Sequence, residues 1–155
     1  MNWEKTMWIM SACALWGYIL TMTLRYGVAS VVSEYAYRGS MWLFTLCIGI
    51  GAVLLMPVLV EEAPEGGKML GFMAAAALGF VAAAPHYKEE ESGIHNAAAA
   101  AAGAMAVLWT ASVNVWWLLA AVAAWVMAGL LTRKWWLMAE VCGLGMVYAA
   151  AWTAA

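Results

Sequence analysis

Two histidines, His86 and His95, stand on either side of the acidic run KEEES, and they are the only histidines in the 155-residue chain. Among the glutamates outside that run, Glu34 and Glu140 lie on the same predicted face of the membrane as the histidines. Imidazole and carboxylate side chains transfer protons in general acid–base catalysis, and they also bind divalent metals. The same groups hydrogen-bond to small molecules and lipid headgroups. The elements that position these four residues decide between these chemistries.

The composition predicts that these elements are membrane helices. The chain is 67% hydrophobic and 10% charged, whereas soluble domains carry about 25% charged residues. We therefore expect residues 1–155 to form a single integral membrane domain in contact with the lipid bilayer. A net charge of −2 and the lack of a basic stripe argue against a nucleic-acid partner.

Charged residues divide the chain into uncharged stretches of membrane-spanning length. A helix needs about 20 residues to cross a hydrocarbon core of about 30 Å. The uncharged stretch from Ser92 to Thr132 is 41 residues long, so the polar sequence TASVN at 110–114 predicts a turn within it. The fold class is therefore all-α, a polytopic membrane helical bundle. Its six predicted transmembrane helices span approximately 6–25, 40–60, 69–86, 94–111, 114–132 and 135–154.

The tryptophan-rich composition supports this count, because tryptophan and tyrosine prefer the two membrane–water interfaces. The chain contains eleven tryptophans. Six spans place most of them, with several tyrosines, in two belts. One belt contains Tyr26, Trp42, Tyr87, Trp135 and Trp136, and the other contains Trp3, Trp8, Trp109, Trp116, Trp117 and Trp152.

Unusual polar residues gather on one predicted face, because alternating spans bring loops one, three and five together. Helical spacing also puts Tyr18, Thr21 and Arg25 on one stripe of the first helix. We therefore predict a polar pocket on this face, with His86 and His95 at its mouth and Arg25 attracting an anionic group. The candidate ligand-binding residues are Arg25, Glu34, His86, His95, Glu140, Tyr18 and Thr21.

Small residues follow a four-residue spacing on the third and fourth predicted helices. Such spacing allows membrane helices to approach closely, so these two helices are expected to form a tight hairpin. The stripes comprise Gly71, Ala75, Gly79, Ala82 and His86 on one helix, and His95, Ala99, Ala102 and Ala106 on the other.

Glu140 is the strongest single polar signal in a span. A charged group at the centre of a membrane helix costs about 2.5–3.5 kcal/mol on insertion scales, and such residues usually face the bundle interior beside a partner. Arg133, Arg25 or a histidine is the expected partner, and the alternative to a charged partner is a protonated, uncharged carboxyl group. A structural hydrogen bond is the alternative for Glu140, just as helix capping is for His95 and solvation is for the KEEES run.

A metal site is not predicted. His86, His95 and Glu140 offer zinc ligands, but the histidines are nine residues apart across a loop and no HxxxH or HExxH motif occurs. Nucleophile-elbow, phosphate-binding and dinucleotide-binding motifs are also missing from the sequence. No cofactor is therefore expected.

Residues 33–109 carry a family-like pattern: SEYAYRGSMWLF, LLMPVLVEE, AAAPHYKEEESGIHNAAAAAAG and VLW. This pattern resembles small six-span bacterial membrane proteins classed as a domain of unknown function. On that resemblance, His95 matches a histidine that opens helix four, and Glu34 matches an acidic residue of loop one. The resemblance implies a bacterial inner membrane location.

More distantly, the chain is similar to ceramidase-like membrane hydrolases, and a resemblance to them implies zinc held by three histidines with a serine and an aspartate. This chain has two histidines and no aspartate, which argues against zinc amidase activity. Its size and tryptophan content also resemble the tryptophan-rich sensory (translocator) family, although that family's proline-rich tryptophan motifs are missing here.

Three functions remain open on the sequence. The first is a binding or transport protein for a small molecule or lipid headgroup. The second is a lipid-modifying enzyme with a histidine–carboxylate pair, and the third is an accessory subunit with a homo-oligomeric or membrane-protein partner. Five basic residues in the odd loops against two elsewhere predict that the odd loops are cytoplasmic.

Overall fold

A computed structural model describes residues 3–86 and 92–154, and these residues form helices and connections without a strand. The prediction of an all-α fold is confirmed. Five helical segments in this part of the chain are long and apolar enough to cross a membrane. The long helices are α1 (Trp3–Tyr26), α3 (Met41–Glu61), α4 (Lys68–Ala83), α5 (Ser92–Thr132) and α6 (Trp135–Ala154).

Shorter elements lie in the connections. The helix α2 (Glu34–Arg38) follows α1, in the region that we predicted as a loop. Two single 3₁₀ turns, η1 (Glu65–Gly67) and η2 (Ala84–His86), flank α4. Tyr87, which we assigned to an aromatic belt, and residues 88–91 of the KEEES run, which we assigned to a solvated loop, lie outside the described residues, and Ser92 begins α5.

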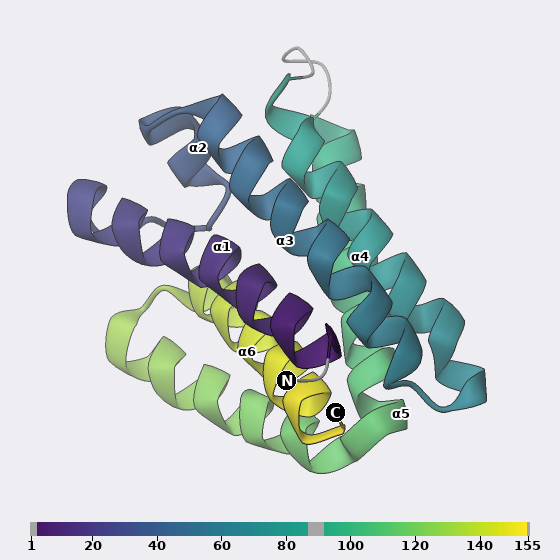
Figure 1. The fold of residues 1–155 in the computed structure, drawn as a ribbon. Coiled ribbons are helices and arrows are strands. Elements are labelled where there is room, and N and C mark those ends of the chain that lie inside the picture. Colours follow the sequence, from purple (N-terminus) through teal and green to yellow (C-terminus); the bar gives the residue numbers. More distant parts are fainter. Residues whose placement is uncertain (1–2, 87–91, 155) are drawn as a thin grey trace.

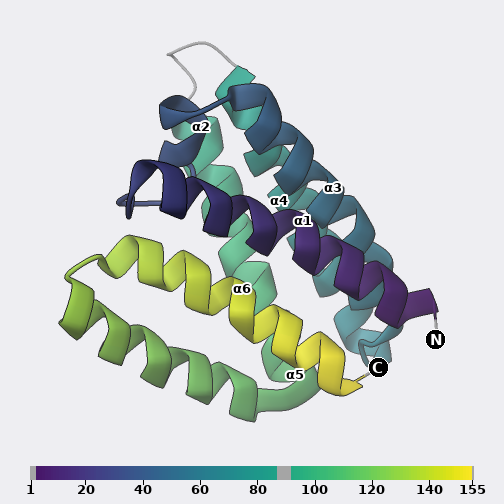
Figure 2. The ribbon, with the colours of Figure 1, turned by 60° about the vertical axis from the view of Figure 1, so that its left-hand side comes forward.

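A bend interrupts α5 at Asn114, where the backbone leaves the helical region at φ −160° and ψ 102°. Asn114 Oδ1 accepts a hydrogen bond from the Trp116 N–H at 3.0 Å, and it thereby caps the helical segment that follows. Figures 1 and 2 show the chain turning sharply here, after which it runs beside α6. The bend separates a first part of α5, residues 92–113, from a second part, residues 115–132.

The helical segments form two layers. In both views, α1, α6 and the second part of α5 run alongside one another in one layer (Figure 1). The other layer contains α3, α4 and the first part of α5 (Figure 2). The α1–α3 packing joins the layers along much of their length, whereas α1 and α6 meet over a small contact.

Local sequence explains where helices begin and end. Gly27 has a left-handed φ of 77°, and its N–H donates to the Thr23 carbonyl at 2.9 Å, which is the usual way for glycine to end a helix. Ser40 Oγ accepts the Leu43 N–H at 3.4 Å and caps α3. Between α5 and α6, Arg133 adopts a left-handed φ of 57°.

Hydrogen bonds near the termini join α1 to α3 of the other layer and to α6 of its own layer. Ser11 Oγ on α1 donates to the Gly51 carbonyl on α3 at 2.6 Å. The same oxygen hydrogen-bonds to the Tyr148 hydroxyl on α6 at 2.5 Å. Trp8 Nε1 donates to the Tyr148 carbonyl at 2.9 Å. Each bond crosses between helices, so the network fixes their relative positions.

The prediction that Trp109 belongs to an interfacial belt is wrong. Its ring is fully buried, and Nε1 donates to the Leu59 carbonyl of α3 at 2.8 Å. Gly71 of α4 makes room for this contact, since a Cβ there would lie 2.9 Å from Trp109 Nε1. Trp109 is therefore a packing residue that connects α5 to α3.

Candidate functional site

A cavity of about 300 Å³ lies between the two layers. Its walls come from α1, α3, α4, the first part of α5, α6 and the connection before α2. Most of the lining side chains are apolar. The polar lining residues in the described part of the chain are Ser33, His95 and Glu140, so the walls are mainly apolar and these three side chains add polar groups.

Small side chains leave this space open. The predicted stripe of His95, Ala99, Ala102 and Ala106 lines the cavity as a set. Its alanines therefore bound an open volume, in addition to any role in bringing helices together. The other small lining residues are Ala74, Ala75, Gly103, Ala139 and Gly143.

Glu140 joins α6 to the connection before α2. Its Oε2 accepts a hydrogen bond from the buried Val32 N–H at 2.5 Å. The expected side-chain partner, Arg133, Arg25 or a histidine, is not observed among the described residues. The physical reason is that the irregular connection leaves the Val32 N–H without a helical acceptor, and Glu140 supplies one.

His95 lies half-buried near the start of α5 and lines the same cavity as Glu140. No hydrogen bond or ion pair between these two side chains is found in the part of the chain that the structure describes. The structure therefore brings His95 and Glu140 to one cavity without direct contact. A molecule within the cavity has access to both.

No family model, curated protein or solved structure matches this chain. Its function is therefore inferred from the arrangement of its own residues.

His86 lies outside the cavity lining. It is exposed, its Nε2 shares a hydrogen bond with Thr45 Oγ1 at 2.8 Å, and its ring lies 4.3 Å from that of Trp42. The two predicted entrance histidines thus occupy different places, since His86 packs against α3 and His95 faces the cavity. The tight turn at η2 directs His86 to the α3 side.

The predicted stripe of Tyr18, Thr21 and Arg25 on α1 is also split between buried and exposed positions. Arg25 and Thr21 are exposed, and the Arg25 guanidinium lies 5.4 Å from the Tyr26 ring centroid. Tyr18 is buried, and its ring packs edge-on against the cavity residue Phe44 at 5.8 Å. The buried face of α1 contains Leu15, Tyr18 and Met22, so Thr21 and Arg25 fall beyond its edge and outside the cavity.

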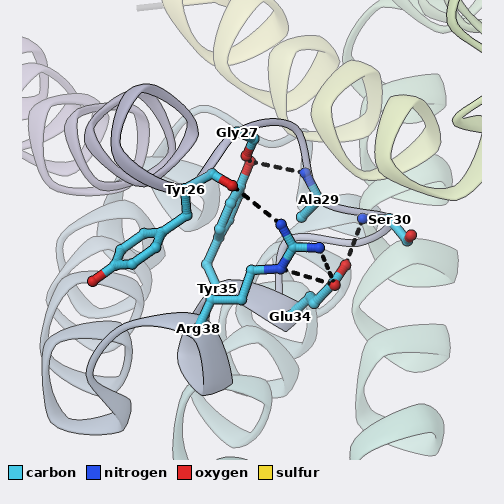
Figure 3. A network of polar contacts seen from close by, with 7 residues as sticks. All are labelled: Tyr26, Gly27, Ala29, Ser30, Glu34, Tyr35 and Arg38. Atoms are coloured by element: carbon cyan, nitrogen blue, oxygen red, sulfur yellow. Dashed lines mark hydrogen bonds and ion pairs between the residues drawn. The ribbon is translucent and has the colours of Figure 1, made fainter.

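Glu34 belongs to a surface network that shapes the connection between α1 and α3 (Figure 3). Its Oε1 pairs with Arg38, and Arg38 Nη1 also donates to the Tyr26 carbonyl at 3.2 Å. Its Oε2 accepts the Ser30 N–H at 2.6 Å. The hydrogen bond from Ser30, together with the neighbouring Arg38, lowers the pKa of Glu34. Glu34 therefore has a structural partner and does not line the cavity.

Tyr35 forms the buried centre of this connection (Figure 3). Its hydroxyl donates to the Gly27 carbonyl at 3.0 Å and accepts the Ala29 N–H at 3.2 Å. Thr23 Oγ1 also lies within 2.8 Å of it. These bonds fix the backbone that brings Val32 and Ser33 to the cavity.

From the sequence we expected loop one, with its valines, tyrosines and Glu34, to lie in the interface as a lid, but Val32, Ser33 and Tyr35 were not singled out. The available signal was the segment VVSEYAYR, which contains apolar and aromatic residues unusual for a solvated loop. Among residues 3–86 and 92–154, no group of three or more His, Cys, Asp or Glu is arranged to hold a metal ion. His95 and Glu140 are the predicted residues that share a cavity.

Proposed function

We propose that this protein is a membrane protein that binds the apolar body of a small molecule or lipid in the cavity between its two layers. The observation that carries the proposal is the cavity of about 300 Å³ with apolar walls and a few polar groups. Ligand sites in proteins are usually concave and mostly apolar, with volumes of about 300–1,000 Å³. Ser33, His95 and Glu140 would orient a polar head.

Six transmembrane helices are part of this proposal. The segment Gly93–Thr132 contains 40 residues, and a straight helix of that length is about twice as long as a hydrocarbon core is thick. The bend at Asn114 divides it into two parts of membrane-spanning length. Large apolar side chains are exposed on the outer surface, as lipid contact requires, including Leu20, Leu24, Leu46, Val53, Leu130 and Leu131.

The proposed location is a bacterial inner membrane with the odd-numbered loops in the cytoplasm. The basic residues that follow odd-numbered spans in the sequence are Arg25, Arg38, Lys88, Arg133 and Lys134, whereas Lys5 and Lys68 belong to the other side. The positive-inside rule favours this orientation. Reporter domains fused after Thr132 and after Ala154 test it, since only the first should be active in the cytoplasm.

The connection of residues 27–38 serves as a cover for the cavity in this proposal. Val32 and Ser33 line the cavity, and Glu140 holds the Val32 backbone. The Tyr35 network keeps the cover in one conformation. Entry of a ligand from this face would then require the Val32–Glu140 bond to open.

Native mass spectrometry of the full chain, extracted in a mild detergent, tests the proposed function. Wild type should retain a small bound mass. Ala102→Leu fills the cavity and should lose it, whereas Ala101→Leu adds the same volume at an exposed position of the same helix and should keep it. Retention by Ala102→Leu, or no bound mass after incubation with extracted membrane lipids, would contradict the proposal.

An enzyme is the second candidate, because His95 and Glu140 share one cavity. An imidazole and a carboxylate facing a lipid could carry out acid–base chemistry. In that case, His95→Ala should abolish turnover of extracted lipids and leave the retained mass in place. Under the binding proposal alone, the lipids should be recovered chemically unchanged from wild type.

A further inference from the structure

We propose that the ligand of this cavity carries a protonated amine on an apolar body, with the amine paired to Glu140. This inference rests on the proposed function, since it concerns the polar head of a molecule held in the same cavity. It replaces our expectation of an anionic group attracted by Arg25, because Arg25 lies outside the cavity.

The charge of the lining supports a cationic head. Among residues 3–86 and 92–154, Glu140 is the lining residue with a carboxylate, and no lysine or arginine of these residues belongs to the lining. Arg38, at the end of the cover, and Arg25, just before its start, are exposed, and Arg38 is paired with Glu34. An anionic head in the cavity would face a carboxylate without a compensating cation from the described residues.

The hydrogen bonds of Glu140 leave one oxygen available. Oε2 accepts the Val32 N–H, whereas Oε1 has no donor among the residues described and is not fully enclosed by protein atoms. An ionised carboxylate removed from water without a cation is unfavourable. A cationic donor at Oε1 would therefore stabilise both the bound ligand and the carboxylate.

His95 and Ser33 suit the same head group. A neutral imidazole has one donor and one acceptor nitrogen, a hydroxyl can accept, and a primary ammonium has three donors. The ammonium can thus donate to Glu140 Oε1 and use a further donor toward Ser33 or His95. The alanine and leucine walls beyond them accommodate a hydrocarbon chain.

Binding of tritiated decylamine to the full chain in lipid nanodiscs tests this inference, with empty nanodiscs correcting for partitioning. Decanol and decanoate serve as unlabelled competitors with the same apolar chain. Wild type should prefer decylamine to both. Glu140→Gln preserves an acceptor for the Val32 N–H, yet it should weaken decylamine binding by about tenfold or more, as expected when a charged hydrogen bond becomes neutral. Glu61→Gln makes the same chemical change at an exposed position outside the cavity and should bind as wild type does.

The outcomes separate this inference from the proposed function. Equal binding of decylamine and decanol, stronger binding of decanoate, or unchanged decylamine affinity in Glu140→Gln would overturn the amine assignment. If decanol displaces tritiated decylamine from wild type, and Ala102→Leu shows no saturable decylamine binding, the cavity remains a site for apolar molecules. If none of the three compounds shows saturable binding, both the amine assignment and the proposed function fail.

Discussion

The Val32 N–H and the Glu140 carboxylate, 108 positions apart in the sequence, form a hydrogen bond of 2.5 Å between the cavity cover and α6. Glu140 is the side chain on α6 that holds this backbone. The same carboxylate is therefore a structural acceptor at one oxygen and a candidate ligand contact at the other.

Replacement of Glu140 should separate these two roles. Glu140→Ala leaves the buried Val32 N–H without an acceptor, which should lower the free energy of unfolding by about 1–3 kcal/mol. Glu140→Gln retains a carbonyl oxygen that can accept the Val32 N–H, so it should lower the free energy of unfolding by less. Unfolding in mixed detergent micelles, followed by tryptophan fluorescence, provides the comparison. Equal losses in the two variants would show that the Val32 bond contributes little.

The Ser11–Tyr148 hydrogen bond should stabilise the fold, so replacement of either residue should lower the free energy of unfolding. Ser11→Ala leaves the buried Tyr148 hydroxyl without its side-chain partner and should cost about 1–3 kcal/mol. Tyr148→Phe removes one hydrogen bond, while Ser11 keeps its bond to Gly51, so we expect a smaller loss of about 0.5–1.5 kcal/mol.

The double variant Ser11→Ala/Tyr148→Phe should lose less than the two single losses combined, because neither partner then remains unpaired. The same unfolding assay measures this coupling. Tyr37→Phe, at an exposed tyrosine, controls for removal of a hydroxyl. Strict additivity of the two single changes would argue against the bond.

Two glycines of α4 should respond differently to alanine. A Cβ at Gly71 would lie 2.7 Å from the Leu59 carbonyl oxygen, whereas one at Gly79 meets no atom within 4 Å. Gly71→Ala should therefore destabilise the protein by about 1–3 kcal/mol through overpacking. Gly79→Ala should be neutral or stabilise by up to about 1 kcal/mol, since alanine favours helix. Thermal unfolding of both variants checks the contrast, and a stable Gly71→Ala would refute the close approach of α4 to α3.

Glu34 should make stability depend on pH in the acidic range. Its folded pKa lies below the ordinary value of 4.5, so its contribution is present above pH 4.5 and is lost as the pH falls through the folded pKa. Wild type should therefore lose stability with acidification more steeply than Glu34→Gln over that range. Melting temperatures between pH 6 and pH 3 provide the test, with the exposed Glu61→Gln as a control. Parallel curves for wild type and Glu34→Gln would contradict this role.

The helices were largely predictable because charge and apolar length determine them. The polar interruption at 110–114 correctly located the bend, which lies at Asn114. The short helix α2 was missed, since five residues give too little periodicity to distinguish a helix from a loop. Trp109 was misplaced because its position in the sequence cannot show that Gly71 leaves room for it.

The candidate site was less predictable. Sequence spacing groups Thr21 and Arg25 with Tyr18 on one stripe, but it does not tell which edge of that stripe is buried. His86 and His95 are both near loop three, yet the direction of each side chain depends on tertiary packing. The cavity itself is a property of several helices together, so no single segment encodes it.

In the first part of α5, alanine side chains maintain the helix and at the same time leave the space beside it open. Alanine has the highest helix propensity of all residues, so this segment needs no large side chains to remain helical. Under the proposed binding function, the side chains at positions 99, 102 and 106 would set the size of the molecule that the cavity admits. Chains with this backbone and different residues at those three positions would admit molecules of different length without any change of architecture.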